Sequence, residues 1–119
     1  MSVSAEQLRE RTKQFALRII KVYRALPKTG EARVLGNQLL RSGTSVAANY
    51  RAAGRARSRA EFASKIGTVV EEADETVFWL ELIVDAGLVR RTRIENLLKE
   101  ANELLAIFAA SHGTARSRR

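Results

Sequence analysis

The sequence predicts an all-α fold, an antiparallel up-down-up-down four-helix bundle. Apolar residues recur at steps of four and three along four long segments, which places them on one face of each helix. No segment alternates apolar and polar residues for long enough to form a strand. The chain holds one proline and seven glycines in 119 residues, so we expect a single domain with short loops.

The first helix is expected at about residues 4–26. Ser4 suits the N-cap with Gln7 three positions later, and Pro27 ends the helix. Its predicted apolar stripe is Leu8, Thr12, Phe15, Ile19, Val22 and Leu26.

The second helix is expected at about residues 32–55, after a turn at residues 28–30. Its predicted apolar face is Leu35, Leu39, Val46, Tyr50 and Ala53.

The third helix is expected at about residues 58–86, with Ser58 as N-cap, Glu61 at the capping-box position and Gly87 just past its end. Its predicted stripe is Phe62, Ile66, Val69, Ala73, Thr76, Leu80 and Ile83.

The fourth helix is expected at about residues 91–111 and carries Ile94, Leu97, Leu98, Ala101, Leu104, Leu105 and Phe108. Residues 1–112 then form the bundle. The polar and basic residues 113–119 are expected to be a disordered tail.

The composition excludes several classes of function. The absence of cysteine rules out disulfides and Cys-ligated metals, and the single histidine rules out a catalytic triad or a multi-histidine metal site within one chain. No charge-free stretch comes near the roughly 20 residues that span a bilayer, and the N-terminus lacks a signal-peptide pattern. We therefore expect a cytoplasmic protein with no catalytic residues, no metal, no cofactor and no membrane contact.

The charge is strongly basic, with 21 Lys and Arg against 13 Asp and Glu and a net charge of +8. Such a balance attracts phosphates. The densest cationic run lies at the corner between the second and third helices, and a second patch lies on the first helix. The candidate nucleic-acid-binding residues are Arg51, Arg55, Arg57 and Arg59 at the corner, with Arg18, Lys21 and Arg24 in the second patch.

The alternative interpretation of the corner is a solvated turn that keeps the protein soluble. Aromatic residues that stack on bases are few, and only Tyr50 lies nearby, so sequence-specific recognition of single strands is not favoured.

The second helix contains a polar stripe formed by Gln38, Ser42, Ser45 and Asn49, beside its apolar face. Small residues that allow close helix approach, with hydrogen bonds to Glu72, Glu75 and Thr76 of the third helix, explain this stripe structurally. The functional alternative is a polar cleft that holds a ligand.

An acidic cluster on the third helix invites an enzymatic interpretation. Glu71, Glu72 and Glu75 match the EExxE pattern with which all-α nucleotide pyrophosphohydrolases hold magnesium. A salt-bridged or solvated helix face is the alternative. The later ExxD part of that pattern is not matched, and nothing resembles a pocket for a nucleotide base.

Several segments together resemble a known family. The chain is similar over about residues 12–108 to the bacterial four-helix bundle proteins encoded in intervening sequences of 23S rRNA genes. These include the accessory variability determinant proteins of diversity-generating retroelements. The resemblance is carried by residues 15–20, 26–27, 38–50, 57–62, 65–66, 71–76 and 79–80. At Ala52 the chain departs from the family, which usually has a Glu there that can pair with Arg41.

The resemblance implies a homopentamer of antiparallel bundles with a basic surface and no assigned catalytic residue. In the retroelement members that surface engages nucleic acid and a reverse transcriptase. The sequence therefore predicts a non-enzymatic oligomer that binds RNA or DNA through its phosphates, as an accessory to a nucleic-acid-processing enzyme. A protein-binding scaffold and a magnesium-dependent nucleotide hydrolase at the Glu71–Glu75 cluster are the alternatives.

Overall fold

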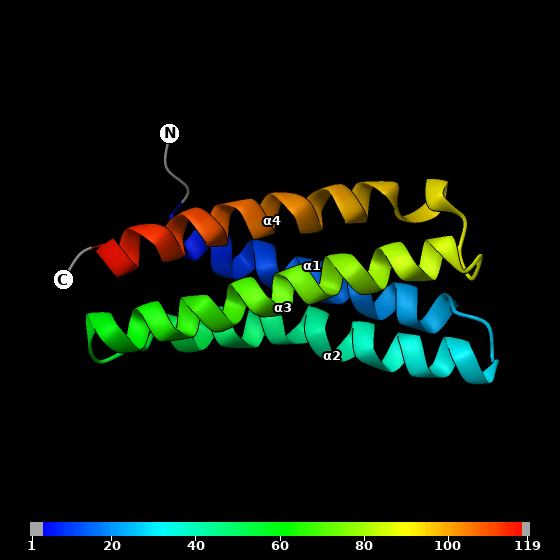
Figure 1. Ribbon diagram of the computed structural model, residues 1–119, viewed down its shortest axis with the longest axis horizontal. Coiled ribbons are helices and arrows are strands. Elements are labelled where there is room, and N and C mark those ends of the chain that lie inside the picture. Colours follow the sequence, from blue (N-terminus) through cyan, green and yellow to red (C-terminus); the bar gives the residue numbers. More distant parts are fainter. Residues whose placement is uncertain (1–3, 118–119) are drawn as a thin grey trace.

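The computed structural model describes residues 4–117, which form four helices. They are α1 (Ala5–Ala25), α2 (Gly30–Ala53), α3 (Arg59–Asp85) and α4 (Arg91–Ser117). The helices run along a bundle of 48 × 28 × 20 Å, and consecutive helices are antiparallel (Figure 1). The predicted fold class is confirmed.

Capping groups explain where three of the helices begin. At α1, the Gln7 backbone N–H donates to the Ser4 hydroxyl oxygen and the Ser4 N–H donates to the Gln7 side chain, which is the predicted capping box. The Ser58 hydroxyl accepts from Glu61 N–H at α3. Thr29 caps α2 in the same way, so this helix begins at Gly30, two residues before the predicted start.

The ends of α1 and α3 also follow from local chemistry. Leu26 is extended because a following proline disfavours helical geometry. At the end of α3, Gly87 has a φ of 76°, and the Leu88 N–H donates to the Ile83 carbonyl at 3.1 Å. This Schellman motif confirms Gly87 as the residue past the helix end.

The fourth helix is longer than the sequence predicted. It continues through Gly113 to Ser117, so the prediction of a disordered tail is wrong for residues 113–117, while residues 118–119 lie outside the described residues. Thr114 and Ser117 donate their hydroxyls to carbonyls of the preceding turn, Ala110 and Thr114 respectively. These bonds and the helix-forming Ala115 outweigh the single glycine, which costs about 1 kcal/mol relative to alanine.

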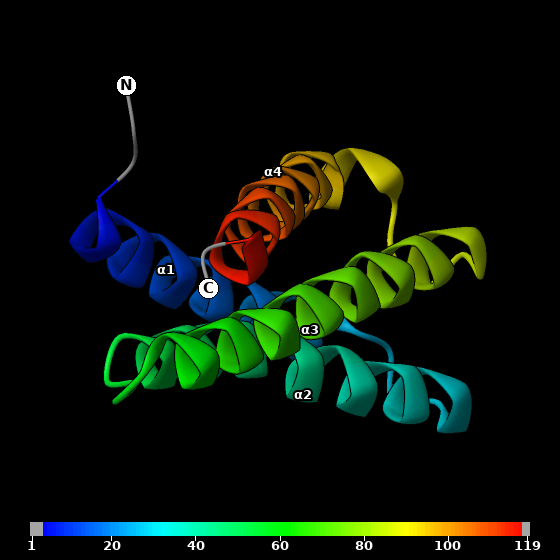
Figure 2. The same cartoon turned by 60° about the vertical axis from the view of Figure 1, so that its left-hand side comes forward.

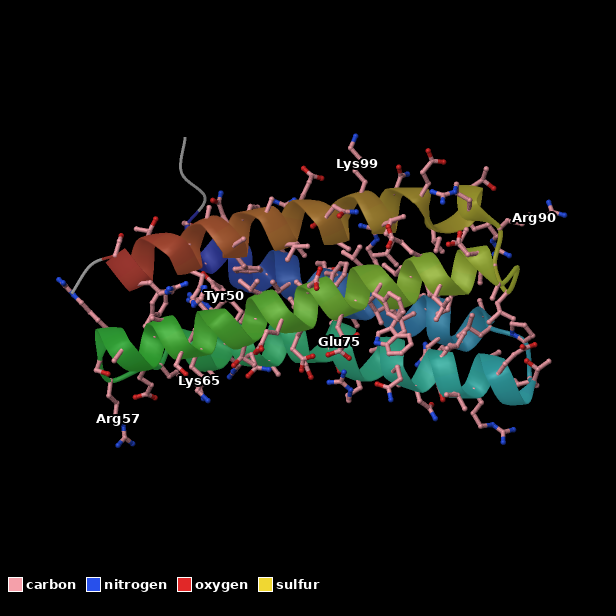
Figure 3. All side chains as sticks on the ribbon, in the orientation of Figure 1. Tyr50, Arg57, Lys65, Glu75, Arg90 and Lys99 are labelled. Carbon is pink, nitrogen blue, oxygen red and sulfur yellow. The ribbon has the colours of Figure 1, made fainter. Side chains whose placement is uncertain are left out.

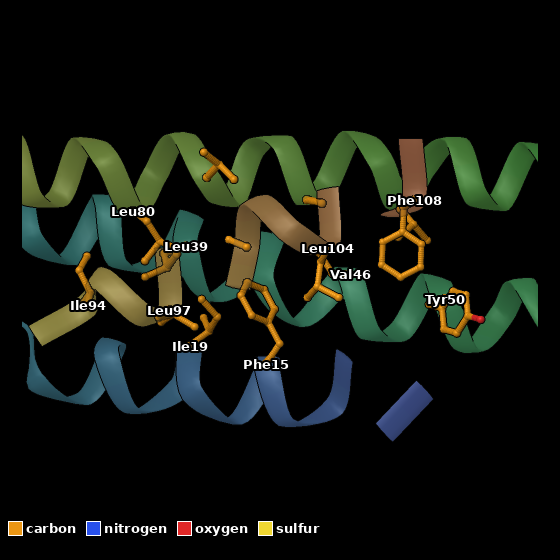
Figure 4. Close-up of a cluster of buried hydrophobic side chains, with 14 of the residues drawn as sticks. Phe15, Ile19, Leu39, Val46, Tyr50, Leu80, Ile94, Leu97, Leu104 and Phe108 are labelled. Atoms are coloured by element: carbon orange, nitrogen blue, oxygen red, sulfur yellow. The ribbon is translucent and has the colours of Figure 1, made fainter. Parts of the chain in front are cut away.

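The core lies between the four helices and is built from their predicted stripes (Figure 4). Phe15, Ile19, Leu39, Leu104 and Phe108 are among its fully buried side chains. α3 packs against α2 and α4, whereas α1 packs against α2 and only sparsely against α4. α1 and α3 therefore lie diagonally across the bundle (Figure 2).

Some apolar residues outside the predicted stripes pack against the core, and others are exposed to solvent. Val77 is buried, and Val70 and Val84 pack against the core, so the core face of α3 is wide. Phe78 is 51% exposed. No helix of the described part of the chain combines the length and the apolar character needed to cross a membrane.

Candidate nucleic-acid interface

The corner between α2 and α3 is a short, hydrogen-bonded turn that projects its arginines outward. The Arg55 N–H donates to the Ala52 carbonyl and the Ala56 N–H to the Ala53 carbonyl. Arg51 lies in the last turn of α2, and Arg55 and Arg57 lie in the loop after it. All three arginines are exposed.

These arginines surround a shallow hollow of about 430 Å³ between the end of α2 and the start of α3. Lys65 joins them from α3, and Arg57 and Lys65 project on the same side of the bundle (Figure 3). We call Arg51, Arg55, Arg57 and Lys65 the corner surface. The hollow is lined by Ala48, Arg51, Ala52, Arg55, Arg57, Glu61 and Lys65.

The charges of the corner surface are not neutralised within residues 4–117. No carboxylate of that part of the chain forms an ion pair with any of the four cations. Glu61 is the one acidic residue lining the hollow, and its carboxylate accepts from the Arg57 backbone N–H at 3.2 Å. The hollow therefore presents a positive potential to an anion.

Arg59 is separated from the other corner arginines. It lines a different hollow, of about 410 Å³, with the half-buried ring of Phe62 and with Ser111, Thr114 and Ala115 of α4. The structure thus brings together three of the four predicted arginines. Lys65 was not among the predicted binding residues, because its contribution depends on the packing of α2 against α3.

The predicted second patch lies toward the opposite end of the bundle and is not one cluster. Lys21 lines a hollow of about 410 Å³ with Arg90 and Arg93, whereas Arg24 lines a smaller one with Lys28 and Arg33. Arg18 lines neither of these hollows and is half-buried. Arg90 and Arg93 were not predicted, because α4 brings them beside α1 from more than 60 residues away.

The polar stripe of α2 contacts α3 through Ser42, and the other bonds of the stripe lie within α2. Ser42 is fully buried, and the Thr76 hydroxyl donates to its oxygen at 2.9 Å. The Gln38 side chain accepts from Arg41, and the Asn49 amide donates to the Ser45 carbonyl. These contacts support the structural explanation of the stripe rather than the ligand cleft.

Two carboxylates of the acidic cluster on α3 bind Arg41 of α2. Arg41 donates to both carboxylate oxygens of Glu72, at 3.1 and 3.2 Å, and to Glu75. Glu75 also accepts from the indole N–H of Trp79. In the described segment 4–117, no group of three or more acidic or histidine side chains is placed to hold a metal ion.

Tyr50, the aromatic residue nearest the corner, belongs to the core. Its ring centroid lies 5.0 Å from that of Phe108, and the side chain is 8% exposed. Burial raises the pKa of the Tyr50 hydroxyl above its ordinary value, and the charge of Arg9 acts in the opposite direction. The ring is therefore not available to stack on a base.

Comparisons with known proteins agree with this architecture. The model of the 23S rRNA-intervening sequence protein family matches residues 6–110. A solved structure from Bacteroides thetaiotaomicron, a protein with unknown function from the S23 ribosomal protein family, is 32% identical with a TM-score of 0.84. The match covers 92% of this chain and 97% of that one, whereas no curated protein matches. The chain belongs to the 23S rRNA-intervening sequence protein family.

Proposed function

We propose that this protein binds RNA or DNA without catalysis, through phosphate contacts made by the corner surface. The observation that carries the proposal is the concentration of four cations around one hollow, with the nearby Glu61 held by the backbone. Contacts of this kind position a protein on nucleic acid and carry no sequence information. The family name associates its members with 23S rRNA, which makes RNA the first ligand to test.

The proposal includes self-assembly and an accessory role beside a nucleic-acid-processing enzyme. One corner surface offers about four phosphate contacts, which is a modest number for tight binding at physiological salt. Several copies on one nucleic acid multiply these contacts and raise the effective affinity.

The test is a titration of nuclease-treated full-length protein into labelled RNA and duplex DNA at about 50 and 200 mM salt. Four phosphate contacts on a duplex predict an affinity loss of roughly a hundredfold between the two salt concentrations. Replacing Arg55→Ala together with Arg57→Ala is expected to weaken binding to all sequences alike and to reduce this loss to about tenfold.

The matched control is Arg91→Ala with Lys99→Ala, which removes the same charge from exposed positions on α4. Binding by the control is expected to stay close to wild type. An equal loss in both variants would show that net charge alone drives binding and would overturn the assignment to the corner. No binding at 50 mM salt would overturn the proposed function and leave the protein-binding scaffold as its replacement.

A further inference from the structure

A hollow of about 410 Å³ lies at the end of the bundle opposite the corner surface. The last turns of α1, the loop between α3 and α4, and the first turn of α4 form its walls. Figure 3 shows Arg90, one of its lining residues, at the end of the bundle opposite Arg57. We call this space the far-end hollow. It lies between two helices, α1 and α4, that pack only sparsely against each other.

Three cations line the far-end hollow, namely Lys21, Arg90 and Arg93, and all three are exposed. None of them forms an ion pair within residues 4–117, and no acidic side chain of that part of the chain lines the hollow. The hollow therefore presents a positive potential to an anion. Two of the three groups are guanidiniums, whose planar donors match the oxygens of a phosphate.

The remaining walls of the far-end hollow are largely apolar. Val22 of α1 and Leu88 and Val89 of the loop are half-buried and pack against the core. Ile94 of α4 also lines the hollow and is 3% exposed. An apolar group that enters the hollow removes its own surface and that of these side chains from water, which is favourable. The hollow thus combines a site for an anion with a site for an apolar group.

Backbone hydrogen bonds hold the loop that lines the far-end hollow. The Leu88 N–H donates to the Ile83 carbonyl at 3.1 Å, and the Arg93 N–H donates to the Arg90 carbonyl at 3.0 Å. A site that is held in advance loses less conformational freedom when a ligand binds. Its volume of about 410 Å³ lies within the range of roughly 300–1,000 Å³ that is typical of small-molecule sites.

We propose that the far-end hollow binds a small phosphomonoester that carries an apolar body. A phosphomonoester has a charge of about −1.5 to −2 at pH 7, which three cations compensate. A phosphodiester in a nucleic-acid backbone carries a single charge and has a polar sugar on both sides, so it leaves the apolar walls uncovered. The inference goes beyond the proposed function, because its ligand and its residues differ from those of the corner surface.

The test is a calorimetric titration of 1-naphthyl phosphate into the full-length protein at about pH 7.5 and about 50 mM salt. One molecule is expected to bind per chain with a Kd on the order of 0.5 mM, the affinity of a modestly efficient ligand with about 15 non-hydrogen atoms. Absence of binding up to about 5 mM ligand would overturn the inference.

Two further probes separate the phosphate from the apolar body. Inorganic phosphate lacks the body and is expected to bind at least about tenfold more weakly than 1-naphthyl phosphate. 1-Naphthyl sulfate has the same body but a single charge, and it is expected to bind at least about threefold more weakly. If either probe binds as tightly as 1-naphthyl phosphate, the assigned class of ligand is wrong.

Substitutions locate the site. Lys21→Ala with Arg93→Ala is expected to weaken binding of 1-naphthyl phosphate at least about tenfold, because it removes two charged hydrogen-bond donors from exposed positions. Ala25→Glu adds a carboxylate at an exposed position that lines the hollow and is expected to weaken binding as well. Circular dichroism checks that both variants keep the helical fold.

The matched control is Arg55→Ala with Arg57→Ala, which removes the same charge from the corner surface. This control is expected to bind 1-naphthyl phosphate like wild type. An equal loss of affinity in the control and in the variant of the far-end hollow would contradict the assignment to this hollow, and so would a loss confined to the control.

The inference and the proposed function fail separately. Lys21→Ala with Arg93→Ala is expected to leave RNA binding close to wild type, since the corner surface is unchanged. RNA that displaces 1-naphthyl phosphate from the wild-type protein would show that nucleic acid occupies the far-end hollow and would overturn the inference. Absence of RNA binding at 50 mM salt would overturn the proposed function alone, because the titration with 1-naphthyl phosphate does not depend on it.

Discussion

At the scale of single residues, Gly43 decides how closely α1 and α2 approach. A Cβ at this position would lie 2.8 Å from both γ carbons of Ile19. Ile19 is fully buried and β-branched, so its χ1 has little freedom to move the side chain aside. A glycine within a helix is unfavourable by about 1 kcal/mol relative to alanine, and here the close helix contact compensates for it.

Gly43→Ala is therefore expected to lower the free energy of unfolding by about 1–3 kcal/mol, despite the better helix propensity of alanine. The measurement is urea denaturation followed by circular dichroism. Gly113→Ala is the control, because its Cβ would meet nothing within 4 Å, and it is expected to stabilise by up to about 1 kcal/mol. A Gly43→Ala protein as stable as wild type would contradict the packing argument.

At the scale of helices, the α2–α3 pair is held by a buried polar contact. The Thr76 hydroxyl lies 2.9 Å from the Ser42 hydroxyl and 2.7 Å from the Glu72 carbonyl. Ser42→Ala and Thr76→Val are each expected to cost about 1 kcal/mol, and the double variant less than their sum, because both substitutions remove the same hydrogen bond between Thr76 and Ser42. The coupling energy from a double-mutant cycle is expected to be about 0.5–1.5 kcal/mol.

The control for this cycle is Thr44→Val. The Thr44 hydroxyl donates only within its own helix, to the carbonyls of Leu40 and Arg41. The loss of unfolding free energy caused by Thr44→Val should therefore add to the loss caused by Thr76→Val. A coupling energy near zero for Ser42 and Thr76 would show that their contact contributes nothing to the α2–α3 pairing.

The helix boundaries show how far local chemistry predicts the elements. The Ser4 and Ser58 caps, Pro27 and Gly87 act through neighbouring backbone groups, and the structure follows them. The end of α4 was predicted wrongly because the polar and basic character of residues 113–117 was interpreted as a disordered tail, whereas these residues continue the helix. A local signal predicts a boundary well only where a specific cap is present.

At the scale of the whole molecule, the candidate site was predictable only where its residues are close in sequence. Arg51, Arg55 and Arg57 were found from their local density, but Lys65 contributes through the packing of α2 on α3. Arg59 lies two residues from Arg57, at the start of α3, and still lines a hollow beside α4. Helix packing decides which cations share a surface, and the spacing of basic residues along the sequence does not reveal it.

An ion pair joins α1 to α4 across the bundle. Arg11 of α1 donates twice to Glu100 of α4, both at 2.7 Å, and approaches Glu103 at 3.8 Å. The Glu100 side chain is 17% exposed, and its hydrogen bond with Arg11 raises the pKa of the guanidinium above its ordinary value. This pair is therefore worth more than a fully solvated one, which contributes about 0–1 kcal/mol.

Arg11→Met is expected to lower the free energy of unfolding by about 1–2 kcal/mol, because it leaves the Glu100 carboxylate half-buried without its charged partner. Urea denaturation measures this loss, and hydrogen exchange should show the same destabilisation along α4, since α1 and α4 share few other contacts. Lys99→Met, at an exposed position on α4, is expected to change stability by less than about 0.5 kcal/mol. The double variant Arg11→Met with Glu100→Gln is expected to be destabilised less than the sum of the two single variants. Strictly additive losses of unfolding free energy would show that this ion pair does not stabilise the contact between α1 and α4.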